Sequence, residues 1–349
     1  MSPKPLDQCP SYQSLRNLAS FPADIRGGLN PDKFKYQSIH HGPLSLFYGT
    51  YGLSGDHLHL FQSLAEEQEL IAQYQAVLDG QIKNPSENRA VLHPLSRDPG
   101  QHMYRREWER MKQWVQQNIR LDSSTAKGSL VEHVIHVGIG GSERGPMAIM
   151  EALNVVAKPQ VSMHFMSNLD PEPYLEPLGD LDFTRCLFVF VSKSGETAET
   201  LANYELLYAM AKAQGLSDAE FKDRLVIISQ PRSTLFAHCH ATHQFYIGEE
   251  IGGRFSSTTA VGLFSLLLCF GETLAEEFLS GAHFMDKLAL SEKALDNMPM
   301  MGALLALWSH TISEIPIRCV VAYQNALGPF LTHLQQLECE SLGKSHDVD

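Results

Sequence analysis

A group of hydroxyl side chains follows one of the most apolar segments of the chain. Residues 187–191 have the length and composition of a buried strand, and residues 198–214 carry apolar side chains at helical spacing. Four hydroxyls lie at the junction: Ser192, Ser194, Thr197 and Thr200. The first turn of a helix presents unpaired N–H groups and the positive end of the helix dipole, which bind phosphate oxygens. The pattern therefore predicts a phosphate site.

Three other residues of this loop bear on phosphate binding. Gly195 lets the backbone approach a ligand closely. Lys193 can supply positive charge, although side-chain alternation after the strand can point it elsewhere. Glu196 would repel a phosphate if it faced inward, so we expect it to point outward. The alternative is an ordinary N-capped helix, because serine and threonine are favoured caps whether or not a ligand binds.

A glycine-rich turn, residues 138–142, follows a second apolar strand at residues 131–137. It begins like the GxGxxG dinucleotide fingerprint. However, Glu143 stands where that fingerprint needs a small residue for close helix packing, and its charge would face a pyrophosphate. We therefore expect a tight sugar-phosphate loop and no nicotinamide cofactor.

Strands alternate with helices from residue 121 to residue 290. Two further strands are expected at residues 161–166 and 225–229, each followed by a helical segment. Such alternation predicts an α/β fold with a doubly wound parallel sheet covered on both faces. Ligands of these sheets bind at the carboxyl ends of the strands, where the two loops above and residues 229–233 would converge.

The flanking parts of the chain have a different pattern. Helices are expected at residues 56–78 and 104–118, and after residue 290 the pattern restarts with a helix (300–313), a strand (317–323) and a helix (327–340). We predict three parts: 1–120, a mainly helical N-terminal segment; 121–290, a first α/β subdomain; and 291–349, the start of a second subdomain.

Composition narrows the class of protein. The 349 residues are 44% hydrophobic, enough for a sizeable core and longer than one typical domain. A net charge of −13 argues against nucleic acid and anionic membranes as partners. The longest apolar run, residues 260–270, is too short to span a bilayer and predicts a buried helix. The first 13 residues do not resemble a secretory signal. Six scattered cysteines predict reduced core thiols and a cytoplasmic location.

Five segments, in order, resemble motifs of the glucose-6-phosphate isomerase (phosphoglucose isomerase) family. Residues 80–92 resemble its GExIN…RAVLH segment, 137–146 its GIGGS loop, 192–200 its phosphate loop, 251–256 its VGGRYS motif and 335–344 its QQLxMESNGK motif. The resemblance covers about residues 15–349. It implies the sugar isomerase (SIS) fold with two unequal doubly wound subdomains. It also implies that glucose 6-phosphate and fructose 6-phosphate are interconverted in glycolysis and gluconeogenesis.

The resemblance also implies roles for individual residues. Glu340 would be the base that moves a proton between C2 and C1, and Arg254 would stabilise the enediolate. The other expected substrate-binding residues are Gly141, Ser142, Ser192, Lys193, Ser194, Thr197, Thr200, Gly253 and Gln336. This chemistry needs no metal and no redox cofactor. An apolar stripe at residues 327–337 predicts that the last helix packs inward, and burial would raise the pKa of Glu340.

The chain departs from the family pattern at its end. Leu342 replaces the asparagine of the MESNGK motif, and the family normally continues with a histidine, acting across a homodimer, and a lysine that open the sugar ring. Lys344 and His346 belong to the tail of the earlier motif and do not replace them. We therefore expect either a fragment of a longer gene product or a C-terminally truncated relative, with an incomplete second SIS subdomain and little or no isomerase activity. Two alternatives stay open: a catalytically impaired sugar-phosphate-binding or regulatory protein, and an isomerase that also accepts mannose 6-phosphate.

Overall fold

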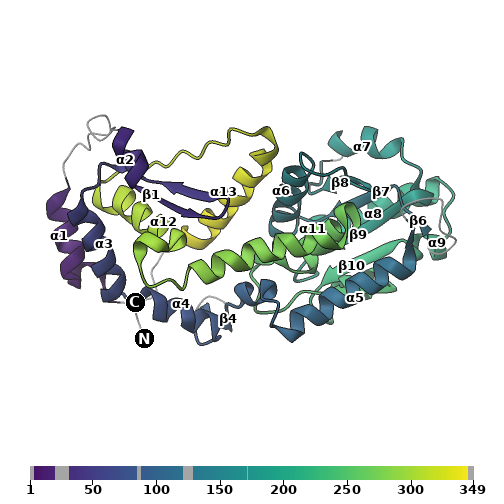
Figure 1. The fold of residues 1–349 in the computed structure, drawn as a ribbon. Coiled ribbons are helices and arrows are strands. Elements are labelled where there is room, and N and C mark those ends of the chain that lie inside the picture. Colours follow the sequence, from purple (N-terminus) through teal and green to yellow (C-terminus); the bar gives the residue numbers. More distant parts are fainter. Residues whose placement is uncertain (1–3, 20–30, 85–87, 121–128, 171, 345–349) are drawn as a thin grey trace. The chain divides into compact units, whose positions relative to one another are not determined.

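The computed structural model describes residues 4–19, 31–84, 88–120, 129–170 and 172–344. The chain divides into two compact units, of which the first comprises residues 1–82 and 281–320 and the second comprises residues 83–280 and 321–349. Both units are discontinuous in sequence (Figure 1). Every segment that the sequence analysis assigned to ligand binding lies in the second unit.

A five-stranded parallel sheet forms the centre of the second unit. Its strands are β7 (His133–Val137), β8 (Ser162–Met166), β9 (Cys186–Val191), β10 (Leu225–Ser229) and β11 (His243–Tyr246), in the spatial order β11-β10-β9-β7-β8. Every residue of β9 and β10 is buried, as expected for parallel strands covered on both faces. The order of the strands reverses between β7 and β9. The predicted doubly wound sheet is therefore confirmed, and its reversal point predicts where a ligand binds.

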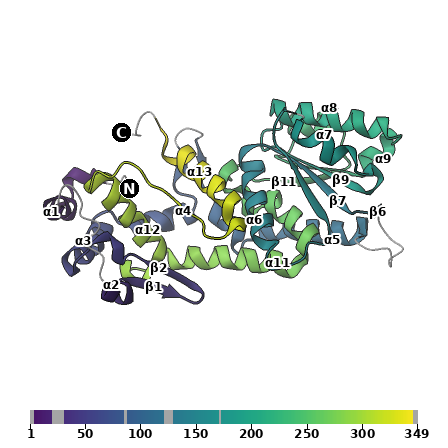
Figure 2. The same cartoon turned by 90° about the horizontal axis from the view of Figure 1, so that it is seen from above.

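Helices cover both faces of this sheet (Figure 2). One face packs against α5 (His102–Asn118), α6 (Arg144–Leu153) and α11 (Ala260–Leu288). The other packs against α7 (Glu172–Gly179), α8 (Ala198–Ala213), α9 (Asp218–Asp223) and α10 (Thr234–Cys239). Alternate residues of β9 contribute to the two cores, because successive side chains of a strand point to opposite faces.

Short elements complete the second unit. They are β3 (Lys83–Asn84), β4 (Arg89–Ala90), β5 (Ile119–Arg120), β6 (Ser129–Leu130), the 3₁₀ turns His93–Arg97, Gly140–Ser142, Phe183–Arg185, Gly253–Thr258 and Asn325–Leu327, and the last helix, α13 (Gly328–Leu342). Two of the 3₁₀ turns, Gly140–Ser142 and Gly253–Thr258, lie against each other, and α13 packs on α6.

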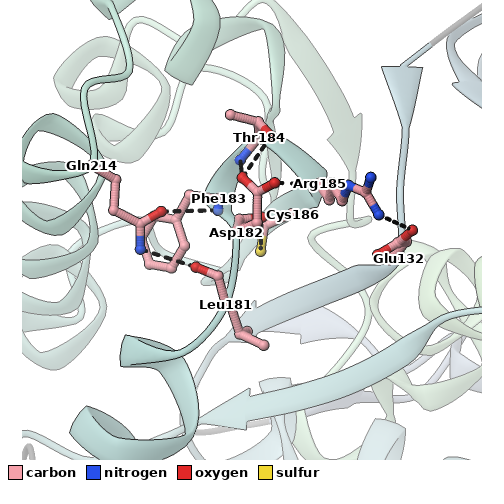
Figure 3. Close-up of polar contacts among 8 residues, drawn as sticks. All are labelled: Glu132, Leu181, Asp182, Phe183, Thr184, Arg185, Cys186 and Gln214. Carbon is pink, nitrogen blue, oxygen red and sulfur yellow. Dashed lines mark hydrogen bonds and ion pairs between the residues drawn. The ribbon is translucent and has the colours of Figure 1, made fainter.

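Hydrogen bonds fix the start of β9, the strand that leads into the predicted phosphate loop (Figure 3). The Asp182 carboxylate accepts from the Thr184 N–H at 2.9 Å and from the Thr184 hydroxyl at 2.6 Å, which caps the turn before the strand. The Gln214 amide, at the end of α8, accepts from the Phe183 N–H and donates to the Leu181 carbonyl, both at 3.0 Å. These bonds tie the start of β9 to the end of α8. Both lie at the end of the sheet opposite the predicted phosphate loop.

Replacing Asp182 by alanine is expected to lower the free energy of unfolding by about 0.5–2 kcal/mol, the usual cost of losing a capping carboxylate. The two hydrogen bonds from Thr184 hold the pKa of Asp182 below its ordinary value. A depressed carboxylate pKa stabilises the folded state above the unfolded pKa, and this stabilisation is lost as the pH falls through the folded pKa. Urea unfolding should therefore show the full difference at pH 7 and a smaller one below about pH 4. An equal loss from Asp180→Ala, at an exposed aspartate nearby, would contradict the capping role.

The first unit is mainly helical. It contains α1 (Pro10–Leu18), α2 (Pro31–Tyr36), α3 (Gly55–Glu67), α4 (Leu70–Leu78), α12 (Met298–Leu307) and a π-helical turn at Trp308–Ile312, together with an antiparallel hairpin of β1 (Ser38–His41) and β2 (Leu44–Phe47). Its core includes Phe61, Leu64 and Trp308. The sequence analysis missed the hairpin, and its single helix over residues 56–78 is broken at Glu69, which has a left-handed φ of 50°.

The predicted strand at residues 317–323 is wrong. These residues have no regular secondary structure; Ile317 is 81% and Tyr323 100% exposed. A strand is stable only when its backbone pairs with a neighbouring strand, and none of the described strands pairs with this segment. The predicted divisions after residues 120 and 290 also differ from the observed units, because α5 packs on the sheet and α13 packs on α6, while residues 281–320 join the N-terminal helices.

The prediction of a buried helix at residues 260–270 and the prediction of buried cysteines have different outcomes. Residues 260–270 are all buried in α11, which confirms the predicted core helix. Among the described residues, the helical stretch 253–288 alone is long and apolar enough to cross a membrane, but 72% of its most apolar window is buried inside the protein. All six cysteines are free thiols, and four are buried as expected, whereas Cys319 and Cys339 are exposed. Their segments lack the packing that the sequence analysis assumed.

Candidate active site

A pocket of about 360 Å³ lies where the loops after β7 and β9 meet, at the reversal point of the sheet. The loop after β7 contributes Ile139, Gly140, Gly141 and Ser142, and the loop after β9 contributes Lys193, Ser194 and Thr197. The remaining lining residues are Arg89, Gln230, Gly253, Arg254, Gln336 and Glu340. Most of the residues predicted from the sequence thus converge on one pocket, including both predicted catalytic residues.

The glycine-rich turn after β7 packs directly against the turn that carries Arg254. A methyl group on Gly141 would lie 2.3 Å from the backbone carbon and oxygen of Gly253 and 2.7 Å from the Arg254 nitrogen, so no larger residue fits there. Gly140 has a φ of 60°, a left-handed conformation that glycine adopts without strain. The Ser256 hydroxyl donates to the Gly253 carbonyl at 2.7 Å. Close backbone packing therefore places Gly141, Ser142 and Arg254 on the same wall.

A buried histidine supports this turn from inside the sheet. Nε2 of His136 on β7 lies 2.7 Å from the Ser142 carbonyl oxygen, and its Nδ1 lies 3.1 Å from the Ser265 hydroxyl on α11. Burial lowers the pKa of His136 to about 4, despite the opposing effect of the bond to Ser142. The neutral ring therefore donates from Nε2 to Ser142 and accepts at Nδ1 from Ser265. Sequence reasoning missed His136 because it lies within a strand pattern.

The loop after β9 is held by its own first hydroxyl. The Ser192 hydroxyl accepts from the Gly195 N–H at 3.1 Å and lies 2.9 Å from the Thr197 hydroxyl. Gly195 has a φ of 75°, and a methyl group there would lie 2.7 Å from the Ser233 Cβ. The backbone can follow this path only with glycine, and the path presents Ser194 and Thr197 to the pocket.

Two of the four predicted phosphate-binding hydroxyls do not line the pocket. Ser192 and Thr200 are both buried, and Ser192 supports the loop instead of facing the pocket. Thr197 precedes α8 but makes no side-chain capping hydrogen bond, which contradicts the interpretation of this segment as an ordinary N-capped helix. Glu196 is exposed and outside the pocket lining, as expected from charge repulsion.

The carboxylate of Glu340 contacts both of its expected neighbours. Its Oε1 accepts from Nε2 of Gln336 at 2.8 Å, and its Oε2 lies 3.5 Å from a terminal nitrogen of Arg254. The Arg254 Nε also donates to the Ser341 hydroxyl at 2.8 Å, and its guanidinium lies over the Phe255 ring. Residues of α13 and of the turn Gly253–Thr258 thus fix the guanidinium beside the carboxylate.

The predicted burial of Glu340 is wrong. Its side chain is 49% exposed, and none of the described side chains of α13 is buried, although the helix rests on α6. The apolar stripe of this helix is also incompletely covered, since Phe330 is 44% exposed. About half of the Glu340 side chain is therefore open to solvent, whereas the side chain of Arg254 beside it is only 20% exposed.

Two pocket residues were not singled out by the sequence analysis. Gln230 directly follows β10 and lies in the segment 229–233, which was expected at this edge of the sheet, but it was not named as a site residue. Arg89 lies in β4, inside the RAVLH-like segment, and no local chemistry marked it. With Lys193 and Arg254 it brings three cationic side chains to a pocket whose lining carries one carboxylate, Glu340. In a chain with a net charge of −13 this local excess of positive charge favours an anionic ligand.

No group of three or more histidine, cysteine, aspartate or glutamate side chains among the described residues has the arrangement of a metal site. The lining of the pocket is instead made of amides, hydroxyls, glycine backbone and the charged side chains above. Hydroxyl groups, guanidinium groups and helix N–H groups are typical partners of sugar hydroxyls and phosphate oxygens.

Comparison with known proteins agrees with this chemistry. The family model described as phosphoglucose isomerase matches residues 48–349. A glucose-6-phosphate isomerase of Borrelia garinii is 34% identical over 96% of this chain and 68% of its own length, and one of Treponema denticola is 34% identical over 98% and 68%. The crystal structure of a glucose-6-phosphate isomerase from Chlamydia trachomatis superposes with a TM-score of 0.88 at 30% identity, covering 98% of this chain and 68% of that one. The chain spans about two thirds of the length of these relatives.

Proposed function

This chain belongs to the phosphoglucose isomerase family, and from that premise we propose that its pocket binds glucose 6-phosphate and fructose 6-phosphate and interconverts them through an enediolate. The fold is the α/β sugar isomerase fold of that family. One observation carries the proposal: a carboxylate, a guanidinium and the N-terminus of a helix face the same pocket, with a lysine and two hydroxyls beside the helix.

The phosphate group binds at the N-terminus of α8. Its oxygens accept from the first-turn N–H groups and from the hydroxyls of Ser194 and Thr197, while Lys193 supplies charge. The sugar hydroxyls bind the turn Gly140–Ser142 and the amide of Gln336. Ser192 holds the loop from behind, and the side chain of Thr200, in the first turn of the helix, is buried. Fixing the phosphate orients the reacting carbons at the other end of the pocket.

The proton moves at the end of the pocket that holds Glu340. The carboxylate removes the proton from C2 of open-chain glucose 6-phosphate; the electron pair of that bond forms the C1–C2 double bond, and the carbonyl oxygen becomes an enediolate. The guanidinium of Arg254 stabilises this developing charge. The hydroxyl proton then moves from O2 to O1, so that the negative charge lies on O2. Return of the first proton to C1 re-forms a carbonyl at C2 and yields fructose 6-phosphate, with no net oxidation. The carboxylate and the guanidinium serve these steps on the open-chain sugar.

The double variant Ser194→Ala/Thr197→Ala is expected to weaken fructose 6-phosphate binding by about 2–3 kcal/mol, because each lost bond to a phosphate oxygen costs about 1–1.5 kcal/mol. Isothermal titration calorimetry of the 349-residue chain measures this loss directly. It corresponds to about 30- to 150-fold in the dissociation constant.

The matched control is Ser162→Ala/Thr242→Ala. Both residues are exposed and lie where β8 and β11 begin, at the edge of the sheet opposite the pocket. We expect this variant to bind like the unaltered chain. Unchanged affinity in a folded Ser194→Ala/Thr197→Ala protein would remove the phosphate site from α8, and no binding by the unaltered chain would contradict the proposed function as a whole.

A homodimer and a cytoplasmic location are part of the same proposal. The free state of all six cysteines supports a reducing compartment. Sedimentation velocity of the purified chain tests the dimer, for which we expect twice the monomer mass.

A further inference from the structure

A second cavity, of about 300 Å³, lies at the end of the sheet opposite the candidate active site. The last turns of α5 contribute to its lining, together with residues at or just before the starts of four strands: Val131 before β7, Leu187 in β9, Arg224 before β10 and His243 in β11. The candidate active site uses the other ends of these strands, and the two linings share no residue. The proposed isomerisation therefore gives this cavity no role.

Part of the lining is apolar and held in place. Val131 and Leu187 are buried, and Trp114 and Ile119 lie beside them in the lining. The indole Nε1 of Trp114 donates to Nδ1 of His243 at 3.0 Å. Burial lowers the pKa of His243, so its ring is neutral near pH 7 and can accept this bond. These side chains offer a fixed apolar surface to a hydrocarbon group of a ligand.

A partly buried guanidinium in the same lining has no partner. Nη1 of Arg224 is buried and makes no hydrogen bond to any described residue. Burial lowers the pKa of Arg224, because its charge is partly removed from water. Asp182 and Glu220 oppose this effect, but their carboxylates accept from the hydroxyls of Thr184 and Ser217 and form no ion pair with Arg224. A buried donor without an acceptor destabilises the folded protein, and an anionic group bound in the cavity would supply one.

A carboxylate lines the cavity next to this guanidinium. Asp223 directly precedes Arg224 and is exposed. Within the part of the chain that the structure describes, the Asp223 carboxylate has neither a hydrogen bond nor an ion pair, and it does not pair with Arg224. Two opposite charges thus border one cavity without meeting. A simple anion would be attracted by Arg224 and repelled by Asp223, whereas a ligand that carries a carboxylate and an ammonium group satisfies both.

We propose that this cavity binds a free α-amino acid with an apolar side chain. The carboxylate of the amino acid pairs with Arg224, its ammonium group pairs with Asp223, and its side chain packs against Trp114 and the apolar residues beside it. A cavity of about 300 Å³ is at the small end of the range for ligand pockets, which suits a single amino acid. The site is independent of the proposed isomerisation.

The test is titration calorimetry of the full 349-residue chain with L-phenylalanine as the probe. We expect a dissociation constant of about 1 mM or below, which is usual for so small a ligand. Two analogues separate the charged contacts: 3-phenylpropanoate lacks the ammonium group, and phenethylamine lacks the carboxylate. Each should bind about tenfold more weakly or worse, because it loses one charge-assisted contact.

The variants assign each contact to its residue. Arg224→Gln should weaken L-phenylalanine binding by about tenfold or more, so that L-phenylalanine binds no more tightly than phenethylamine does. Asp223→Asn should produce a similar loss, so that L-phenylalanine binds no more tightly than 3-phenylpropanoate does. Lys222→Gln is the matched control, because it removes a positive charge two positions from Arg224 and outside the cavity lining. It should bind L-phenylalanine like the unaltered chain.

Three results would overturn the proposal. The first is no binding of L-phenylalanine by the unaltered chain at about 10 mM. The second is full affinity in folded Arg224→Gln or in folded Asp223→Asn, because the ligand would then lie elsewhere. The third is an equal loss in Lys222→Gln, which would indicate a general effect of charge. Thermal melting verifies the fold of each variant. If Arg224→Gln does not fold, Asp223→Asn, at an exposed position, decides the outcome.

Discussion

Replacing Glu340 by glutamine is expected to slow deuterium incorporation at C1 of fructose 6-phosphate in D₂O by about 10²–10⁴-fold, the usual contribution of a general base. Glutamine keeps the shape of the side chain and removes its basicity. The reaction measured is proton removal from the open-chain ketose, so it reports on Glu340 separately from the ring-opening step. Affinity for fructose 6-phosphate should change much less than the rate, because the base acts on a proton that moves only in the transition state.

Glu338→Gln is the matched control, since Glu338 lies on the same helix, two positions earlier and outside the pocket lining. We expect its exchange rate to equal that of the unaltered chain. Nuclear magnetic resonance follows the loss of the C1 proton signal in both variants. A folded Glu340→Gln protein that retains more than about a tenth of the rate would contradict the assignment. Tight binding without exchange in the unaltered chain would instead favour a sugar-phosphate-binding protein.

Replacing Gly141 by alanine should abolish measurable fructose 6-phosphate binding and lower the free energy of unfolding by about 1–3 kcal/mol, the usual cost of overpacking. The added methyl group would lie 2.3 Å from the backbone carbon and oxygen of Gly253, and backbone atoms cannot rotate away as a flexible side chain can. The two turns would have to separate. Their separation would displace both Ser142 and Arg254, because the two turns form one wall of the pocket.

Gly253→Ala provides the control for stability. A methyl group at Gly253 meets no atom within 4 Å, although the residue belongs to the same contact. Urea unfolding should therefore find Gly253→Ala close to the unaltered chain and Gly141→Ala clearly weaker. Equal stabilities would show that the two turns are free to move apart. Calorimetry with fructose 6-phosphate then measures the loss of binding in the folded fraction of Gly141→Ala.

Local sequence patterns predicted the part of the fold that positions the site. The apolar runs that became β7 to β10 are short, nearly continuous and bounded by glycine or hydroxyl residues, which is typical of strands buried in a parallel sheet. The segment 198–213 formed a helix where its apolar spacing indicated one. These predictions succeeded because each depends on residues close in sequence.

Patterns of the same kind failed where the outcome depends on a distant partner. Residues 317–323 have the composition of a strand, yet no described strand pairs with them. The hairpin of β1 and β2 formed from residues that carry no strong strand signal. The apolar stripe of α13 predicted burial, but a stripe indicates only which face of a helix would pack, not how much surface covers it.

The sequence by itself therefore identified the candidate residues for the proposed chemistry: the hydroxyls after β9, the glycine turn after β7, Arg254 and Glu340. Only the tertiary structure decided which of them face the pocket. Ser192 turned inward to hold its own loop, Glu340 remained half-exposed, and Arg89 reached Lys193 across more than 100 residues of sequence. The physical reason is that side-chain type follows from the local sequence, whereas burial and the meeting of charges depend on which distant segments pack together.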